Sequence, residues 1–312
     1  MGGTTWGARD WASYSSTSAS ASTPGATHRT VYTSSSMPSD LDPKAIVTRE
    51  SRNSSANPKS TPIMVWTDVT GSMGQIAHEI IKSGLGVMVE GVLTRKPVSD
   101  PHIAFGGIGD VHCDRAPLQV TQFEADIKMV DQLLKIYMEG GGGGNSFESY
   151  NLAWHFAAYH TSCDAWKDSP PRKGFLFTLG DENPPPNLTA DDLKKVYGRD
   201  QEVVATNQQL LEELRSKYHV FHIIIAQGNA MQYGGTNQEK LWRELLGQNV
   251  LVLDDYTKLG ELIISTMQVV AGDSLSDVAA SWGGSTATSV SRALAEVRSE
   301  VAVRPENGLV AL

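Results

Sequence analysis

The strongest constraint on the fold is an alternation of two kinds of segment between about residues 61 and 271. Five short stretches are almost continuously apolar, which is typical of strands buried on both faces of a sheet. These stretches are PIMVWTD (62–68), HIAFGGIGD (102–110), GFLFTLGDE (174–182), VFHIIIAQ (220–227) and NVLVLDD (249–255). The segments between or after them have helical patterns and span residues 74–94, 122–139, 146–162, 190–198, 206–218, 237–247 and 257–272. Strands that alternate with helices predict a doubly wound α/β domain, in which helices cover both faces of a mostly parallel sheet.

The flanking segments differ from this domain in composition. Residues 1–58 are rich in Ser, Thr, Ala and Pro and have few large aliphatic side chains, which predicts a flexible or partner-ordered arm. Residues 272–312 are expected to form a tail with a short helix over about 288–301 and no core of its own. The predicted organisation is therefore an arm, a central α/β domain over residues 61–271, and a C-terminal tail.

Overall charge and cysteine content limit the classes of function. The formal net charge is -9, which argues against a surface for nucleic acid or anionic membrane. The two cysteines, Cys113 and Cys163, lie outside any CxxC spacing and predict a reducing compartment. No uninterrupted apolar run reaches about 18 residues, and the N-terminal sequence lacks an apolar signal core. We therefore expect a cytoplasmic protein that binds neither nucleic acid nor membrane.

Acidic residues stand at the ends of three predicted strands. They are Asp68, Asp110 and Asp181. In open α/β sheets ligands bind beyond the carboxyl ends of the strands, so three acids at one sheet edge indicate a binding site.

The first of these acids belongs to the sequence DVTGS. Asp68 is followed two and four residues later by the hydroxyls of Thr70 and Ser72, and Gly71 allows a tight turn between them. Hard oxygen donors of this kind suit Mg²⁺, Mn²⁺ or Ca²⁺. The alternative is that the three side chains merely cap the helix that follows, because Asp, Ser and Thr are common N-cap residues.

The segment DVTGSM, placed between a predicted strand and a predicted helix, resembles the DxSxS signature of the von Willebrand factor type A superfamily. Thr70 stands in place of the first serine of that signature. The resemblance covers residues 61–271, about two thirds of the chain, and is closest to intracellular prokaryotic and phage-type members. It implies a metal-ion-dependent adhesion site that holds Mg²⁺, or else Mn²⁺ or Ca²⁺.

The resemblance implies two further site elements. A Gly-rich loop before a helix, EGGGGGNSFES, carries Glu148 where the family usually has Thr, with Ser146 as the reserve ligand. The third element is the strand ending in LGDE, where Asp181, or else Glu182, corresponds to the family acid near the metal. Glu148 would strengthen cation binding and make the ion less electrophilic toward an acidic partner.

The loop after the second strand offers candidates for the rim of the site. Asp110 and Arg115 would lie on the same face as the metal, where mixed charges suit specific protein binding. The sequence has no evident pair of nucleophile and base, and Ser72 lies outside a GxSxG motif. We therefore expect a binding module and not an enzyme, with Mg²⁺-dependent hydrolysis as a minor alternative.

The resemblance also implies classes of partner. Intracellular proteins with this fold commonly act beside AAA+ ATPases of the MoxR type, where a partner's acidic side chain completes the metal site. This chain would then be an adaptor or assembly component. The alternative is a structural or decoration subunit of a phage particle or another large assembly, in which the terminal arms bind neighbouring subunits.

Overall fold

The computed structural model describes residues 36–80, 85–126, 132–140, 144–233 and 237–297. Its centre is a six-stranded sheet in the order β4-β3-β2-β6-β7-β8, parallel except for the edge strand β4. The strands are β2 (Thr61–Asp68), β3 (Pro101–Ile108), β4 (Leu118–Val120), β6 (Gly174–Gly180), β7 (Tyr218–Ile225) and β8 (Val250–Leu253). The predicted fold class is confirmed, and each of the five predicted strands is present.

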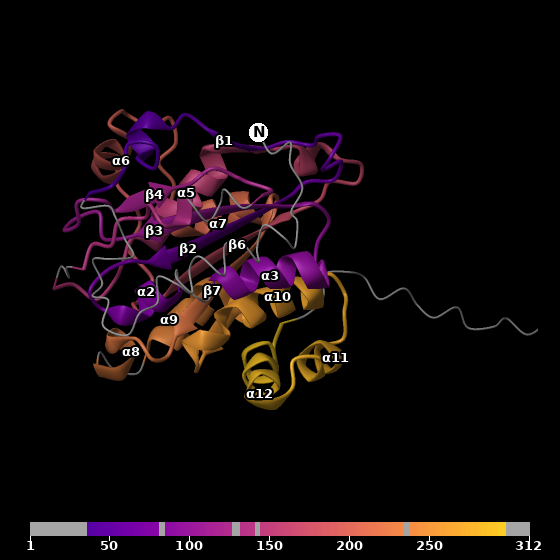
Figure 1. The fold of residues 1–312 in the computed structure, drawn as a ribbon. Helices are drawn as coiled ribbons and strands as arrows, with labels where there is room; N and C mark the ends of the chain where they lie inside the picture. The colour runs from indigo at the N-terminus through magenta and orange to yellow at the C-terminus, as the bar shows by residue number, and fades with distance from the viewer. Residues whose placement is uncertain (1–35, 81–84, 127–131, 141–143, 234–236, 298–312) are drawn as a thin grey trace, which may run out of the picture.

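Helices cover both faces of the sheet (Figure 1). On one face lie α3 (Leu85–Arg95) and α10 (Leu259–Val270), and on the other lie α5 (Tyr150–Tyr159) and α7 (Asn207–Arg215). Each face has its own apolar core because successive residues of a strand point to opposite sides. Further α-helices among the described residues of the central region are α2 (Gln75–Glu79), α6 (Ala190–Tyr197), α8 (Asn229–Tyr233) and α9 (Gln238–Leu246).

The direction of winding reverses at β2. From β2 the chain proceeds outward to β3 and β4, and it then returns to the other side of β2 to build β6, β7 and β8. Thr67 pairs with Leu179 in the parallel register of β2 and β6, so the two strands end side by side. This is the topological switch point at which open α/β sheets bind ligands, and Asp68 and Asp181 both lie there.

The described parts of the flanking segments pack on the domain. Leu41 and Ile46 are buried, and β1 (Arg49–Ser51) pairs in parallel with β5 (Thr161–Cys163) as a separate two-stranded sheet. This packing was not predicted from the Ser-rich and Thr-rich composition. Residues 1–35 of the predicted arm lie outside the described residues.

The tail also contributes to the core. It forms α11 (Leu275–Ala280) and α12 (Gly284–Ala293), which pack on α10 through buried residues that include Val278, Val290 and Leu294. The short helix expected over about 288–301 corresponds to α12, which begins four residues earlier and already ends at Ala293. Residues 298–312 lie outside the described residues.

Two helix predictions differ from the structure. The pattern over 74–94 gives two helices, α2 and α3, with 81–84 outside the described residues. The pattern over 122–139 gives no helix at its start, because Glu124 exchanges backbone hydrogen bonds of 2.9 and 3.0 Å with Ile103 of β3. Pairing with the open edge of β3 prevails there over the helical periodicity. Gln132 and Leu133 are helical, and residues 127–131 lie outside the described residues.

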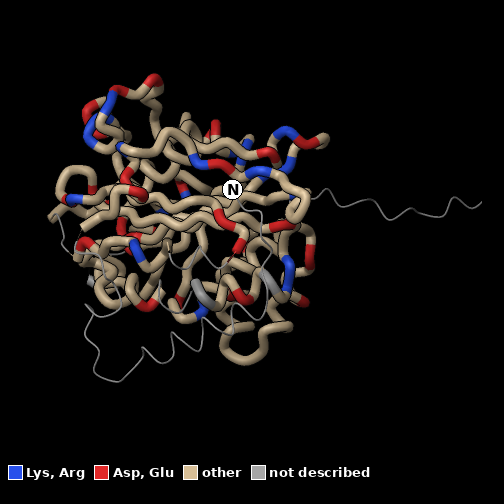
Figure 2. Tube along the Cα trace, turned by 45° about the horizontal axis from the view of Figure 1, so that its top comes forward, with Lys and Arg blue, Asp and Glu red and all other residues tan. Residues whose placement is uncertain are grey.

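Two further observations concern the kinds of partner that the protein could bind. In the view of Figure 2, acidic and basic residues are interspersed along the tube. Among the described residues, no helix combines the length and the apolar character that crossing a membrane would require.

Candidate metal centre

The loop after β2 gathers three side-chain oxygens. The Oδ1 atom of Asp68 accepts hydrogen bonds from the backbone N–H of Thr70 at 2.8 Å and from the Thr70 hydroxyl at 2.7 Å. The hydroxyls of Thr70 and Ser72 lie 3.2 Å apart. The N-cap of α2 is Gly74, with a φ of 52° and no side-chain cap, so the alternative that these residues cap the helix is wrong.

Asp181 joins this loop from the end of β6. Its Oδ1 atom accepts a hydrogen bond of 2.8 Å from the Ser72 hydroxyl, and its Oδ2 atom accepts one of 2.8 Å from the backbone N–H of Ala230. A Cβ atom at Gly228 would lie 2.3 Å from the Asp181 Cβ, so the β7–α8 loop approaches this closely only because residue 228 is glycine. Asp68, Thr70, Ser72 and Asp181 thus form one continuous chain of hydrogen-bonded oxygens.

Glu148 approaches the same point from the segment before α5. Glu148 is only 5% exposed, and its carboxyl group is close enough to Asp68 for the charge of Asp68 to raise its pKa. The backbone at the next residue is fixed by a 3.1 Å hydrogen bond from Ser149 N–H to Gly109 O. Among the described residues, the buried Oε2 atom of Glu148 has no hydrogen-bond partner. We call Asp68, Thr70, Ser72, Glu148 and Asp181 the oxygen cluster.

Within the described part of the chain, the carboxyl groups of the oxygen cluster have no basic side chain as an ion-pair partner. Burial and the charge of Asp181 raise the pKa of Asp68 to about 7, and burial and the charge of Asp68 raise the pKa of Glu148 to about 10. Burial also raises the pKa of Asp181. None of the ion pairs between described residues involves any of the three. Such a group of acids is stabilised either by protons or by a cation.

The chemistry of the cluster fits a hard divalent cation. Among the described residues, no three Asp, Glu, His or Cys side chains lie close enough together to hold a metal ion by themselves. The ligands of a cation at this place would therefore have to include the hydroxyls of Thr70 and Ser72. Carboxylate and hydroxyl oxygens suit Mg²⁺, Mn²⁺ or Ca²⁺ better than metals that prefer sulfur or imidazole. The orphaned Oε2 atom of Glu148 is the observation that best matches a missing positive charge.

The other predicted site residues lie around the cluster. Ser146 is exposed and accepts a 2.9 Å hydrogen bond from the Asn183 side chain through its backbone carbonyl. Glu182 is half-buried, and burial together with Asp181 raises its pKa to about 7.

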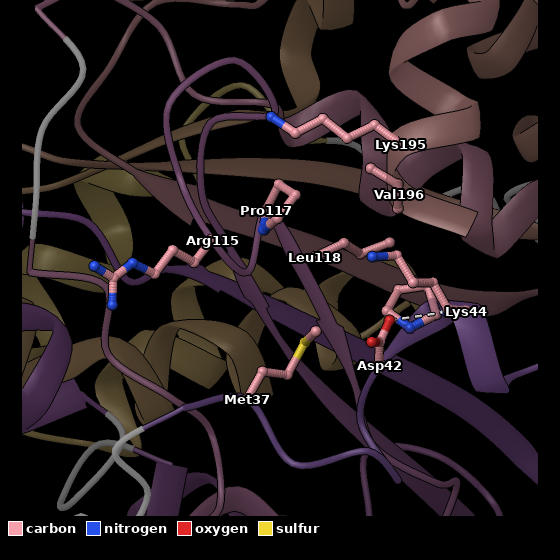
Figure 3. A pocket seen from close by; sticks show the side chains of 9 residues that line it. Met37, Asp42, Lys44, Arg115, Pro117, Leu118, Lys195 and Val196 are labelled. Atoms are coloured by element: carbon pink, nitrogen blue, oxygen red, sulfur yellow. Dashed lines mark hydrogen bonds between the residues drawn. The ribbon is translucent and has the colours of Figure 1, made fainter. Parts of the chain in front are cut away.

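Of the two predicted rim residues, Asp110 acts on Glu148 of the cluster through its charge, whereas Arg115 lines a separate hollow. Asp110 is buried, and its carboxylate accepts hydrogen bonds from the His112 N–H at 2.9 Å and from the Asn145 side chain. Arg115 is exposed and lines a hollow of about 60 Å³ together with Lys44, Leu118 and other residues (Figure 3). This volume is far below the roughly 300–1,000 Å³ of a typical small-molecule pocket.

Tyr150 is a site residue that sequence reasoning missed. Its hydroxyl donates a 3.1 Å hydrogen bond to the Oδ2 atom of Asp68 from the first turn of α5. The hydroxyl occupies space that exists only because residue 180 is glycine: a Cβ atom there would lie 1.9 Å from the Tyr150 oxygen. The sequence places Tyr150 two residues after Glu148, but the contact depends on the packing of α5 across the sheet.

Replacement of Gly180 with alanine is expected to destabilise the protein. Gly180 is not among the residues with positive φ, so an alanine there would ordinarily stabilise the chain slightly. The clash with the fully buried Tyr150 reverses that sign, and we expect a loss of about 1–3 kcal/mol in the free energy of unfolding. Urea denaturation of Gly180→Ala and the parent measures the difference. An unchanged or increased unfolding free energy would contradict the packing described here.

Comparisons with known proteins give only distant similarities. No protein-family model matches the chain, and no curated protein matches its sequence. Among solved structures, proximal thread matrix protein 1 from the mussel byssus is 13% identical, with a TM-score of 0.43, over 68% of this chain and 48% of its own. The pilus adhesin SpaC from Lactobacillus rhamnosus GG is 11% identical, with a TM-score of 0.44, over 69% of this chain and 31% of its own.

A third similar structure is described as von Willebrand factor type A from Catenulispora acidiphila. It is 13% identical, with a TM-score of 0.37, over 68% of this chain and 42% of its own. The matched region therefore spans less than half the length of each of the three proteins.

Proposed function

We propose that this chain is a divalent-cation-dependent protein-binding module with a von Willebrand type A metal site. The ligands would come from the oxygen cluster: Asp68, Thr70, Ser72, Glu148 and Asp181. The observation that carries the proposal is the burial of three acidic side chains, of which Asp68 interacts with both Glu148 and Asp181. Among the described residues none of the three forms an ion pair, and the Oε2 atom of Glu148 has no hydrogen-bond partner.

The residues of the cluster have separate roles in this proposal. The hydroxyls of Thr70 and Ser72 are held in place by Asp68 and Asp181, so their lone pairs are oriented before a cation arrives. Glu148 contributes charge from a different segment of the chain, which ties the start of α5 to the loop after β2. When bound, the cation would supply the positive charge that attracts an acidic side chain of a protein partner.

The proposed partner class follows from this chemistry and from the family resemblance. A protein with an exposed Asp or Glu would complete the site, and an AAA+ ATPase of the MoxR type is one such candidate. We propose binding and not catalysis, because the cluster contains carboxylates and hydroxyls without a histidine or lysine that could act as a base on Ser72.

Calorimetric titration with Mg²⁺, Mn²⁺ and Ca²⁺ tests the proposal. We expect saturable binding to the parent and binding at least about 10-fold weaker to Ser72→Ala, because the hydroxyl that bridges Thr70 and Asp181 is lost. Ser216→Ala, at an exposed site after α7, is the matched control and should bind as the parent does. Absence of saturable binding with all three cations, or unchanged binding by Ser72→Ala, would exclude the proposed site.

A further inference from the structure

The Tyr150 hydroxyl is held between a donor and an acceptor. The backbone N–H of Glu182 points to the hydroxyl oxygen at 3.5 Å, and the hydroxyl lies 3.1 Å from the Oδ2 atom of Asp68. Because the carboxylate only accepts and the N–H only donates, the Tyr150 proton is directed at Asp68. The tyrosine is therefore a hydrogen-bond donor to the candidate metal ligand.

The ring of Tyr150 has little freedom to leave this position. It makes edge contacts with His222 and Trp242, with ring centroids 5.0 and 5.4 Å away. Those two rings are stacked on each other at 3.6 Å, and His222 is bonded to the Thr178 hydroxyl at 2.9 Å. The absence of a side chain at Gly180 completes a slot that fits the phenol. Tyr150 is fully buried in this slot.

As a result, both carboxylate oxygens of Asp68 accept hydrogen bonds from other groups of the protein. Oδ1 accepts two hydrogen bonds from Thr70, and Oδ2 accepts the bond from Tyr150. A carboxylate held in this way cannot easily turn both oxygens toward one cation. Ca²⁺ takes six to eight oxygen ligands and often uses bidentate carboxylates, whereas Mg²⁺ requires fewer ligands in a stricter arrangement.

We propose that Tyr150 is a positioning residue that determines the choice of cation: by holding the Oδ2 atom of Asp68, it favours Mg²⁺ and Mn²⁺ over Ca²⁺. This inference rests on the proposed function, because it concerns the same metal site. Tyr150 does not touch the cation in this scheme, and it acts through the orientation of Asp68. Removal of its hydroxyl frees Oδ2 to join Oδ1 at the cation.

The test is a set of titrations of Tyr150→Phe with Mg²⁺, Mn²⁺ and Ca²⁺. The substitution removes one oxygen and keeps the ring that packs on His222 and Trp242. We expect weaker Mg²⁺ and Mn²⁺ binding and unchanged or tighter Ca²⁺ binding, so that the ratio of Mg²⁺ to Ca²⁺ affinity falls about 10-fold. Tyr197→Phe is the matched control, because Tyr197 is also buried but its hydroxyl bonds to His155, outside the oxygen cluster. The control should keep the parent's ratio.

If Tyr150 had a purely structural role, Tyr150→Phe would bind all three cations more weakly by the same factor, and the ratio of Mg²⁺ to Ca²⁺ affinity would not change. That result would overturn the inference. If the parent binds no cation, the proposed function fails and this inference fails with it. A second measurement does not depend on the folding of Tyr150→Phe. Binding of Mg²⁺ to the parent and to Tyr197→Phe should perturb the ultraviolet absorbance of a buried tyrosine, and absence of that signal would also overturn the inference.

Discussion

Replacement of Asp68 with asparagine is expected to abolish cation binding while leaving the fold intact. Asp68 is fully buried at the centre of the oxygen cluster, and its side chain connects Thr70 to Tyr150. Asparagine has the same shape and still accepts the two hydrogen bonds from Thr70, but it has no charge. We expect Mg²⁺ affinity to fall at least about 100-fold, more than for the loss of an outer-shell partner.

The same substitution should not lower the stability of the cation-free protein. The raised pKa of Asp68 means that its charge is unfavourable in the folded state, and asparagine removes that charge. Calorimetric titration and thermal unfolding at about pH 8 measure the two effects together. Asp164→Asn is the control, because Asp164 pairs with Arg52 at 2.9 Å outside the cluster. Cation binding retained in Asp68→Asn would exclude this aspartate as a ligand.

The central strands could be predicted because strands that are buried on both faces consist mainly of apolar residues, and this pattern is visible in the sequence. In β2 each residue is buried, and its centre from Pro62 to Trp66 has the continuous apolar pattern that two covered faces require. The short strands β1, β4 and β5 have three residues each and no such pattern. Their pairing depends on what lies beside them, so they could not be predicted from local sequence.

The C-terminal tail shows a similar limit. Its helices contain few large aliphatic residues, and for that reason the sequence predicted a tail without a core of its own. Those few residues nevertheless pack into the apolar core beside α10. Polar and cation–π contacts complete the packing: the Arg95 guanidinium lies 3.4 Å from the ring centroid of Trp282, and the indole N–H donates a 2.7 Å hydrogen bond to Ser265. Such contacts between distant segments leave no periodic signal in the sequence.

The candidate site was predictable to the extent that topology determines it. Asp68 and Asp181 follow parallel strands, and the rule for sheet edges places their side chains near each other. The meeting of Glu148 with these acids was expected from family resemblance alone. The contributions of Tyr150 and of the Ala230 N–H could not be foreseen, because they depend on glycines that permit close approach across the sheet.

The stability of the cation-free protein is expected to fall as the pH rises from about 7 to about 9. Burial and Asp68 raise the pKa of Glu148 from its ordinary 4.5 to about 10, so over this range the folded state holds a proton that the unfolded state has lost. The stabilisation from this proton is complete below the unfolded pKa and is lost as the pH approaches the folded one. Histidines with lowered pKa, such as His102 and His155 at about 4, oppose this trend only at lower pH, because they are neutral in both states above about pH 7.

The expected loss over this range is roughly 2–3 kcal/mol from Glu148 alone, which corresponds to a decrease in Tm of about 5 °C or more. Thermal unfolding of the parent, of Glu148→Gln and of the control Glu212→Gln, an exposed residue of α7, measures the slope. Glu148→Gln should reduce the slope of Tm against pH. Saturating Mg²⁺ should also reduce this slope, because the cation pairs with the ionised carboxylates and its binding displaces their protons. A parent with the same Tm at both pH values, or a Glu148→Gln variant with the parent's slope, would contradict the buried, uncompensated charge on which the proposed metal site depends.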